Sequence, residues 1–366
     1  MRYYIIAGEA SGDLHGSNLI KAIRQKDPGA EIRAWGGDKM EEAGAEIVKH
    51  YRDLAFMGFL EVVKHLGTIL ANIKFCKKDI QSWKPDVLIL IDYPGFNLRI
   101  AKWAHLAGIK VLYYISPQVW AWKEGRVKDI KKYVDKMLAI LPFEKAFYAK
   151  WNYDVEYVGH PLLEVITREL KQPLRAIAAE KPIVALLPGS RSQEIRNQLP
   201  LMLKMAERFP GYQFVVAGAP SQPDSLYEEL IGSMPAILVR NDTYNLLKQA
   251  RAALVTSGTA TLETALFSVP EVVCYRGNPV SFWLAKKLVN VPFISLVNLI
   301  MGREVIKELV QNDFSEMALA TELRLLLEDE SYRERIIADY NELWKNLGGG
   351  RASEQAAAVA VKLAGN

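Results

Sequence analysis

Two glycine-containing turns in the second half of the chain combine residue types that can bind a diphosphate. Residues 188–191 follow an apolar run at 183–187, residues 256–259 follow another at 252–255, and a helical pattern starts after each turn. A helix N-terminus has unpaired N–H groups and a partial positive charge, so it attracts anions. Each turn alone is equally typical of an ordinary strand-to-helix connection; together they favour a site. The candidate ligands are Gly189, Ser190, Arg191, Ser257, Gly258 and Thr259.

A carboxylate one helical turn beyond the second glycine turn suits a ribose. Glu263 follows Thr259 by four residues, and its neighbours Leu262, Ala265 and Leu266 are apolar. A carboxylate fixed there can accept hydrogen bonds from both ribose hydroxyls. The alternative is a surface charge paired along its own helix, which the apolar neighbours disfavour. With Arg191 as a fixed cation beside the phosphates, this half of the chain indicates a nucleotide-sugar site.

Acidic residues follow two apolar runs in the first half of the chain. Asp92 closes the run that starts at Val87 and could remove the proton from an attacking hydroxyl, or it could cap the helix expected near residues 96–97. Two carboxylates in the first turn would repel a phosphate, so that turn is expected to bind sugar hydroxyls or to orient the base. Asp13 could equally supply charge at a helix N-terminus. The candidates in the first turn are Glu9, Ser11 and Asp13, with Glu9 as the second candidate base.

Composition indicates an ordinary globular protein of two domains. The chain has 366 residues, of which 50% are hydrophobic and 24% charged, and its formal net charge is only +4, so nucleic acid is not an expected partner. Two cysteines, one in a helical and one in a strand pattern, suggest a reduced cytoplasmic protein. The five histidines lack metal-ligand spacing, so neither a metal nor another cofactor is expected. The N-terminal apolar run is too short for a signal peptide, and no run reaches the roughly 18 apolar residues that span a bilayer.

Short β runs alternate with helical patterns, which predicts an α/β fold with parallel sheets. A polar-ended stretch suggests a linker near residues 160–182. Two Rossmann-like domains are therefore expected, at 1–165 and 175–334, with C-terminal helices from about 335 to 366 crossing back to the first. In such a pair, the nucleotide belongs to the second domain and the acceptor to the first, as in B-type glycosyltransferases. The expected strands are 3–7, 31–35, 87–92, 110–115, 136–140, 155–159, 183–187, 213–217, 236–240, 252–256 and 271–275.

A wide apolar face in residues 59–73 carries lysines and a histidine around it. It predicts either a helix buried against the sheet or an interfacial helix that contacts lipid. Trp120 and Trp122 could extend an interfacial surface. The residues expected to face a membrane in the second case are Leu60, Val63, Leu66 and Leu70.

Seven short stretches in one order resemble the lipid-A-disaccharide synthases, which are inverting glycosyltransferases with the GT-B fold. The resemblance runs from residue 3 to about residue 310, and Tyr93 and Gly95 depart from the expected residue types without affecting Asp92. The stretches are GEASGD at 8–13, IDYPGFN at 91–97, SPQVWAW at 116–122, LPFEK at 141–145, LLPGSR at 186–191, SGTATLE at 257–263 and NLIMGRE at 298–304.

The resemblance implies a reaction and further site residues. Diacylglucosamine would pass from UDP-2,3-diacylglucosamine to the 6-hydroxyl of 2,3-diacylglucosamine 1-phosphate, at the cytoplasmic surface of the inner membrane. Asp92 would be the base, and Asn298, in an expected loop, would close on the donor with Arg303 or Glu304. The alternatives are a UDP-sugar 2-epimerase, a muropeptide glycosyltransferase, or a nonenzymatic binding protein, which would need no base. The oligomeric state stays open, with a homodimer as one alternative.

Overall fold

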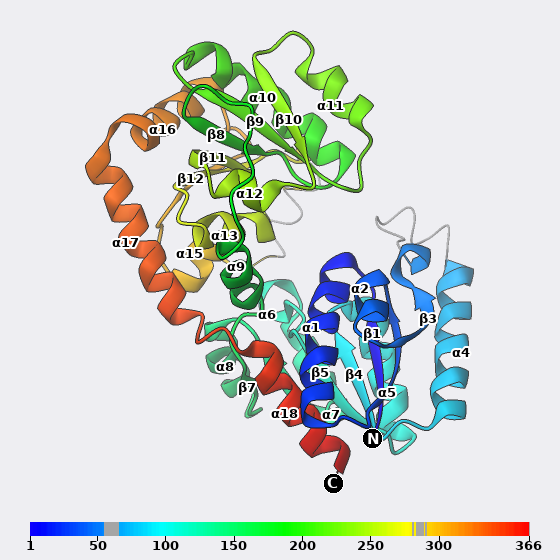
Figure 1. Cartoon of the computed structure of the whole chain (residues 1–366). Coiled ribbons are helices and arrows are strands. Elements are labelled where there is room, and N and C mark those ends of the chain that lie inside the picture. The colour runs from blue at the N-terminus through cyan, green and yellow to red at the C-terminus, as the bar shows by residue number, and fades with distance from the viewer. Residues whose placement is uncertain (55–65, 280–281, 283–288, 290, 366) are drawn as a thin grey trace. The chain divides into compact units, whose positions relative to one another are not determined.

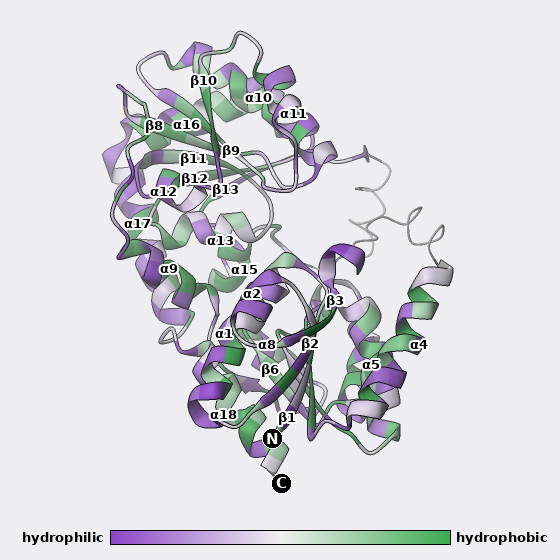
Figure 2. Ribbon diagram, turned by 45° about the vertical axis from the view of Figure 1, so that its right-hand side comes forward, coloured by the Kyte–Doolittle hydropathy of each residue, from purple (hydrophilic) through white to green (hydrophobic). Residues whose placement is uncertain are grey.

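The computed structural model describes residues 1–54, 66–279, 282, 289 and 291–365 and divides into two compact units. The first unit contains residues 1–161 and 347–366, and the second contains residues 162–346. Each unit is a parallel sheet with helices on both faces (Figure 1). The central strands of each sheet are largely apolar, and Figure 2 shows much of them in green, because a parallel sheet is covered on both sides. The α/β class with two parallel sheets, predicted from the sequence, is confirmed.

The first unit contains a seven-stranded sheet in the order β3-β2-β1-β4-β5-β6-β7, with every pairing parallel. The central strands β1 and β4 are buried apart from Arg2. The strands are β1 (Arg2–Ala7), β2 (Glu31–Gly36), β3 (Glu46–His50), β4 (Val87–Ile91), β5 (Lys110–Tyr114), β6 (Lys136–Ala139) and β7 (Glu156–Tyr157).

Helices cover both faces of this sheet. On one face α1 packs against α2 and α18, and α18 also contacts β4 and β5, while α5 contacts α4 and α7. Only α18 of the C-terminal helices belongs to this unit. The helices are α1 (Ala10–Lys26), α2 (Asp38–Glu42), α4 (Leu66–Trp83), α5 (Pro94–Leu106), α6 (Val119–Trp122), α7 (Val127–Tyr133), α8 (Pro142–Ala149) and α18 (Ala352–Gly365), with 3-10 turns η1 (Tyr51–Leu54) and η2 (Glu124–Arg126).

The second unit contains a six-stranded parallel sheet in the order β10-β9-β8-β11-β12-β13. Its strands are β8 (Ile183–Leu187), β9 (Gln213–Gly218), β10 (Ala236–Arg240), β11 (Ala250–Thr256), β12 (Glu271–Tyr275) and β13 (Lys307–Val310). Its helices are α9 (Leu162–Leu170), α10 (Ser192–Arg208), α11 (Asp224–Ile231), α12 (Thr243–Leu247), α13 (Thr259–Leu266), α15 (Leu296–Met301), α16 (Glu316–Glu328) and α17 (Glu330–Asn346).

The eleven expected strands are all present, with ends shifted by a few residues, but two edge strands were missed. β3 (EIVKH) and β13 (KELV) contain charged residues in place of a continuous apolar run, so pairing in the sheet rather than local pattern defines them. Asp329 separates α16 from α17. The loop expected around Asn298 is wrong: Asn298 lies inside α15.

Each sheet reverses its strand order at one point, between β1 and β4 in the first unit and between β8 and β11 in the second. At such a point the connections from two adjacent parallel strands leave toward opposite faces, which opens a crevice at the carboxyl ends of the strands. The turns after β1 and β4 carry Glu9 and Asp92, and those after β8 and β11 carry the two glycine turns. The topology therefore brings the candidate residues of each unit together.

Asp13 is part of the frame of the first turn. Its buried carboxylate accepts hydrogen bonds from the N–H groups of Gly37 (2.7 Å), Lys39 (3.1 Å) and Met40 (3.1 Å), at the start of α2. The charge thus complements a helix N-terminus, but that of α2 and not of its own helix. These three backbone donors occupy the carboxylate that was expected to contact a sugar.

We expect Asp13→Ala to lower the free energy of unfolding by roughly 1–3 kcal/mol, because it leaves three N–H groups without their acceptor in a buried place. Urea denaturation followed by circular dichroism measures the change. Glu41→Ala removes an exposed carboxylate of the same helix and should change stability by less than about 0.5 kcal/mol. Equal stability of the two variants would contradict the structural role of Asp13.

Candidate functional site

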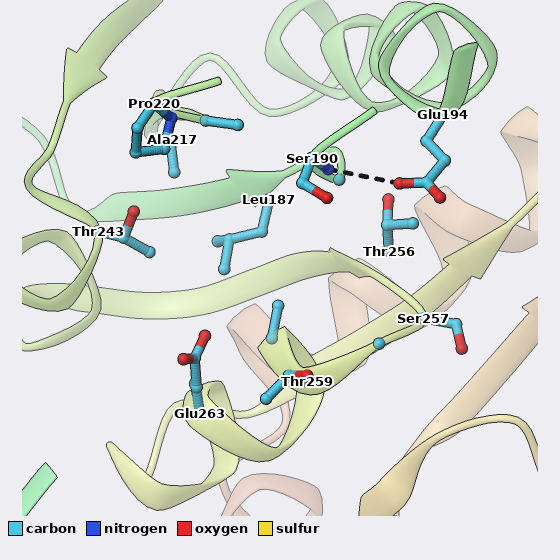
Figure 3. A pocket seen from close by; sticks show the side chains of 14 residues that line it. Leu187, Ser190, Glu194, Ala217, Pro220, Thr243, Thr256, Ser257, Thr259 and Glu263 are labelled. Carbon is cyan, nitrogen blue, oxygen red and sulfur yellow. Dashed lines mark hydrogen bonds between the residues drawn. The ribbon is translucent and has the colours of Figure 1, made fainter. Parts of the chain in front are cut away.

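A cavity of about 330 Å³ at the carboxyl ends of β8 and β11 is the candidate site of the second unit. Figure 3 shows Ser190 and Glu194 on one side of it and Thr259 and Glu263, from α13, on the other. Its lining residues are Leu187, Gly189, Ser190, Glu194, Ala217, Ala219, Pro220, Thr243, Thr256, Ser257, Gly258, Thr259, Ala260 and Glu263.

The first glycine turn wraps around the carboxylate of Glu194. Gly189 has φ of +107°, and a Cβ on it would meet the Oε2 atom of Glu194 at 2.8 Å, so a side chain is excluded there. The same Oε2 accepts from the N–H groups of Ser190 and Arg191, both at 3.4 Å. The Arg191 guanidinium pairs with Oε1 at 3.2 Å and is largely exposed. A carboxylate thus sits where backbone N–H groups can receive an anion.

The second glycine turn is tied to the segment before α15. The Ser257 hydroxyl donates to the carbonyl of Ile294 (2.8 Å), and the Ile294 N–H donates to the carboxylate of Glu308 (2.9 Å). The buried Thr256 hydroxyl, in the cavity lining, has no hydrogen-bond partner among the described residues. A buried hydroxyl without a partner costs free energy unless a ligand satisfies it.

Glu263 is held by a tyrosine at the cavity wall. The Tyr244 hydroxyl donates to Oε1 of Glu263 at 2.7 Å, and the Tyr244 ring packs against Phe267 with centroids 5.3 Å apart. Burial raises the pKa of Glu263, and the hydrogen bond from Tyr244 opposes the rise. The carboxylate therefore has one oxygen fixed by the protein and further acceptor capacity for a polar ligand. The alternative of a surface pair along α13 is wrong.

Asp92 occupies a constrained position at the switch point of the first unit. Asp92 and Tyr93 both have left-handed backbones, with φ of +43° and +48°. The Asp92 carbonyl accepts from the Tyr113 hydroxyl (2.6 Å) and from the Asn97 amide (2.8 Å), which fixes this peptide. Asp92 does not cap α5, whose N-cap position is Tyr93.

The environment of Asp92 disfavours its charge. Burial raises the pKa of the Asp92 carboxyl to about 6, the negative charge of Glu9 adds to the rise, and a hydrogen bond from the Tyr93 backbone opposes it. A carboxylate with a pKa in this range is a better proton acceptor than an ordinary aspartate, yet it is still ionised at neutral pH. Perturbed carboxyl groups of this kind gather at functional sites.

The first βα turn lies beside Asp92 because Gly8 leaves room for a ring. A Cβ on Gly8 would meet ring carbons of Tyr93 at 2.4–2.7 Å. Glu9 is half-buried at the N-cap of α1, and Ser11 is exposed in its first turn. Both remain accessible to a ligand, in contrast to Asp13.

Arg191 does not line the cavity, although its neighbours Gly189 and Ser190 do. Three further donor-side candidates, Asn298, Arg303 and Glu304, also lie outside the lining. The Asn298 amide is fully buried: it donates to Ile306 and Glu308 and accepts from the N–H groups of Val305 and Ile306. Arg303 forms ion pairs with Asp339 and Glu342 of α17, and Glu304 pairs with Lys307. These side chains are engaged with the frame of the second unit.

The candidate membrane helix is described only in part. Leu60 and Val63 lie outside the described residues, and nothing is described of the Leu66 side chain. Leu70, in α4, is 58% exposed, and Phe75 of the same helix is 47% exposed. The described helices include none with the length and apolar character needed to cross a bilayer.

Sequence reasoning missed Glu194, Tyr244 and Thr256. Glu194 stands three residues after Arg191, at the position where a helix-capping glutamate is expected, and that spacing could have revealed it. Thr256 ends an expected strand directly before the second glycine turn. Tyr244 follows β10, and no local pattern links it to Glu263 because the contact depends on the order of strands in the sheet.

The chain matches a known family over nearly its whole length. The family model described as Lipid-A-disaccharide synthetase matches residues 3–363. Lipid-A-disaccharide synthase of Trichlorobacter lovleyi is 41% identical over 372 residues, covering 99% of this chain and 97% of the relative. The enzyme of the same name from Coxiella burnetii is 40% identical over 368 residues, covering 98% and 97%.

Solved structures with the same fold have distant sequences. UDP-GlcNAc 2-epimerase from Neisseria meningitidis, bound to UDP-GlcNAc, superposes with a TM-score of 0.71 at 12% identity and covers 99% of this chain and 100% of its own. The calicheamicin glycosyltransferase CalG4 superposes with a TM-score of 0.61 at 15% identity and covers 100% and 98%. At these identities the similarity shows the fold alone.

We expect Asp92→Asn to stabilise the first unit at neutral pH. The folded pKa of about 6 lies above the ordinary value of 3.8, so the unfolded chain releases this proton first and stability falls as the pH rises between these values. Above pH 6 the asparagine variant should be more stable than the wild type by about 1–3 kcal/mol, because it avoids the whole loss of stability. Below pH 4 the two proteins should have the same free energy of unfolding. Thermal melts at pH 4 and pH 8 measure the difference. An equal gain at both pH values would contradict the charge argument.

Proposed function

The chain belongs to the lipid-A-disaccharide synthase family, and from this premise we propose its substrates and the residues that act on them. The donor is UDP-2,3-diacylglucosamine, and the acceptor is 2,3-diacylglucosamine 1-phosphate. The acceptor 6-hydroxyl attacks the anomeric carbon, the bond from that carbon to the UDP phosphate breaks, and a β-1,6 disaccharide 1-phosphate and UDP result. The observation that carries the assignment of the base is the raised pKa of Asp92 at the switch point of the first unit.

The cavity of the second unit binds the UDP portion of the donor in this proposal. The two turns offer backbone N–H groups to the phosphates, and the unpartnered Thr256 hydroxyl supplies a further donor. Glu263 accepts from the ribose hydroxyls while Tyr244 keeps it in place. Arg191 balances the charge that develops on the leaving UDP, since a guanidinium can bind two phosphate oxygens at once.

Asp92 accepts the proton of the acceptor hydroxyl as the new bond forms. Removal of that proton increases the nucleophilicity of the oxygen, and attack from the face opposite UDP inverts the anomeric configuration. A pKa of about 6 leaves the carboxylate ionised at neutral pH and close enough to that pH for efficient proton transfer. Glu9 keeps this pKa raised and is the alternative base, and the exposed Ser11 hydroxyl can contact the sugar.

The remaining candidates position the donor site and do not contact the donor themselves. The Asn298 amide donates to the carboxylate of Glu308, and this carboxylate also accepts from the N–H groups of Ile294 and Ser295. Because Ser257 donates to the Ile294 carbonyl, this network sets the position of the second glycine turn. Arg303 and Glu304 are proposed to stabilise the same region through ion pairs with α17 and Lys307.

A lipid substrate favours peripheral association with the inner face of the inner membrane. The exposed apolar side chains of Leu70 and Phe75 lie on α4 together with Lys74, Lys77 and Lys78. Apolar side chains mixed with cations suit an interface between acyl chains and anionic head groups. This helix continues from the segment whose apolar pattern first suggested lipid contact.

We expect Asp92→Asn to lower turnover by roughly 10²–10⁴-fold, because the amide keeps the shape but accepts no proton. The assay follows UDP and disaccharide formed from the two lipid substrates, with UDP binding measured separately and expected to be unchanged. For the wild-type enzyme, kcat/KM should rise as the pH increases through about 6, because the ionised carboxylate is the active form. Near-normal turnover of the variant would exclude Asp92 and make Glu9 the next candidate. Release of a 2-epimer in place of the disaccharide would contradict the proposed reaction.

We expect Arg191→Ala to weaken UDP binding by about 10-fold to 100-fold, since one charge-assisted contact with phosphate is lost. Isothermal calorimetry with UDP measures this effect. Arg196→Ala is the control, because Arg196 is a cation of α10 that lies beyond the first glycine turn and pairs with Glu229. Unchanged affinity in Arg191→Ala would mean that Arg191 does not contact the bound nucleotide.

A further inference from the structure

A second cavity lies in the first unit, along the groove between α5 and α7, with a volume of about 220 Å³. Its wall combines cations with apolar side chains, a composition that suits an anionic amphiphile. The lining residues are Pro94, Gly95, Leu98, Arg99, Ala101, Lys102, Arg126, Asp129, Ile130, Tyr133 and Val134.

Three cations face this groove and one carboxylate accompanies them. Within the described residues, Arg99, Lys102 and Arg126 form no ion pair with a carboxylate. Lys102 lies over the Tyr133 ring at 5.5 Å from its centroid, and Arg126 lies 5.8 Å from the centroid of Trp122. Aromatic contacts hold such side chains in place without neutralising them. The groove therefore attracts an anion.

One end of the groove adjoins the turn that carries Asp92. Pro94 and Gly95, which begin α5, are only two and three residues beyond Asp92. A Cβ on Gly95 would meet nothing within 4 Å, so the first turn of this thirteen-residue helix faces open space. The helix N-terminus adds partial positive charge to that of the side chains.

Arg126 also lines the groove. Its charge opposes the rise that burial causes in the pKa of Tyr113, so the guanidinium acts on that hydroxyl. The Tyr113 hydroxyl in turn donates to the Asp92 carbonyl. The charge of Arg126 therefore acts on the hydroxyl that holds the peptide carrying the base.

We propose that this groove binds the phosphomonoester of the acceptor lipid, with Arg126 and Arg99 as its principal ligands and Lys102 as a third cation. The inference rests on the proposed function. The 6-hydroxyl and the 1-phosphate occupy opposite sides of one sugar ring, so the phosphate site must lie within one sugar of the base. The end of the groove beside the Asp92 turn meets this requirement. Leu98 and Ile130 provide apolar contact for hydrocarbon of the same molecule.

The site selects between acceptors that do and do not carry a phosphate. Each charge-assisted contact with a phosphate typically contributes about 10-fold or more to affinity. An acceptor with a free 1-hydroxyl would leave the cations without a counterion and would bind more weakly. Asp129 limits the attraction, because its carboxylate repels the phosphate across the same groove.

The experiment compares two acceptors, 2,3-diacylglucosamine 1-phosphate and 2,3-diacylglucosamine, in neutral detergent micelles. Arg126→Ala and Arg99→Ala should each raise the KM of the phosphorylated acceptor by about 10-fold or more. The KM of the donor should stay the same, and the preference of the enzyme for the phosphorylated acceptor should collapse. Asp129→Asn should lower the KM of the phosphorylated acceptor by a few-fold. Lys128→Ala is the control, because Lys128 is an exposed cation of α7 that does not line the groove. It should change neither the KM of the phosphorylated acceptor nor the acceptor preference.

A binding measurement separates this inference from the proposed function. Glucosamine 1-phosphate, followed by ³¹P NMR during titration with the full chain, should bind to the wild-type protein and lose affinity in Arg126→Ala and Arg126→Gln. The glutamine variant keeps a long polar side chain against Trp122 and guards against misfolding, which thermal melts report. Failure of transfer activity with intact phosphate binding would refute the proposed function alone. Absence of phosphate binding would refute the groove.

Two kinetic outcomes overturn the proposal. If the variants lost equal activity with both acceptors, Arg126 and Arg99 would support the structure of the Asp92 turn and would not bind the phosphate. The second outcome would show that the cations bind the phosphate groups of anionic membrane lipids. If the variants keep full activity in neutral micelles but sediment less with phosphatidylglycerol vesicles, the cations bind a lipid surface and not the substrate.

Discussion

The reversal of strand order in each sheet is the constraint on which the candidate sites depend. Helices that follow two adjacent central strands must leave toward opposite faces, so the chain cannot fill the space above those strands. The turns there keep backbone N–H groups and short polar side chains directed outward. In the first unit this edge carries Glu9 and Asp92, and in the second it carries the turns at Gly189 and Gly258.

Equivalent edges of two similar sheets differ in charge, and the difference divides the chemistry. The first unit places two carboxylates at its switch point, where the charge of Glu9 raises the pKa of the Asp92 carboxyl and neither carboxylate attracts a phosphate. The second unit places Arg191 and two helix N-termini at its switch point, which attract one. Glu194 already accepts the N–H groups of Ser190 and Arg191, so any anion at that turn must share or replace this contact. One architecture can therefore hold a nucleotide in one unit and a base in the other.

The sequence predicted the features that depend on local pattern. Central strands such as β4 and β8 are continuous apolar runs, and the glycine turns follow them directly. The edge strands β3 and β13 were not predicted because charged residues interrupt their short sequences, EIVKH and KELV. The partners of Asp13 were not predictable either, since α2 reaches its carboxylate only after β1 and β2 pair.

Asn298 shows a different limit. The family resemblance of the stretch NLIMGRE implied a ligand contact, but the folded chain uses the Asn298 amide for four hydrogen bonds within the second unit. A side chain that organises a loop and one that contacts a substrate produce the same sequence motif. Only the burial of the amide separates these roles.

The first unit holds Asp92 in place although its backbone conformation and the burial of its carboxylate both cost free energy. Such a local feature carries information about function that the fold alone does not. Left-handed backbones at Asp92 and Tyr93 cost of order 1–3 kcal/mol each, and burial of the carboxylate adds a further cost. Tyr113 and Asn97 fix the carbonyl, and the Tyr93 ring packs over Gly8, so the surrounding contacts over-determine the strained conformation. Epimerases share the architecture at 12% identity, and the architecture alone does not specify a reaction. A strained, desolvated carboxylate beside a groove with three cations is the local feature that favours proton removal from an anionic acceptor.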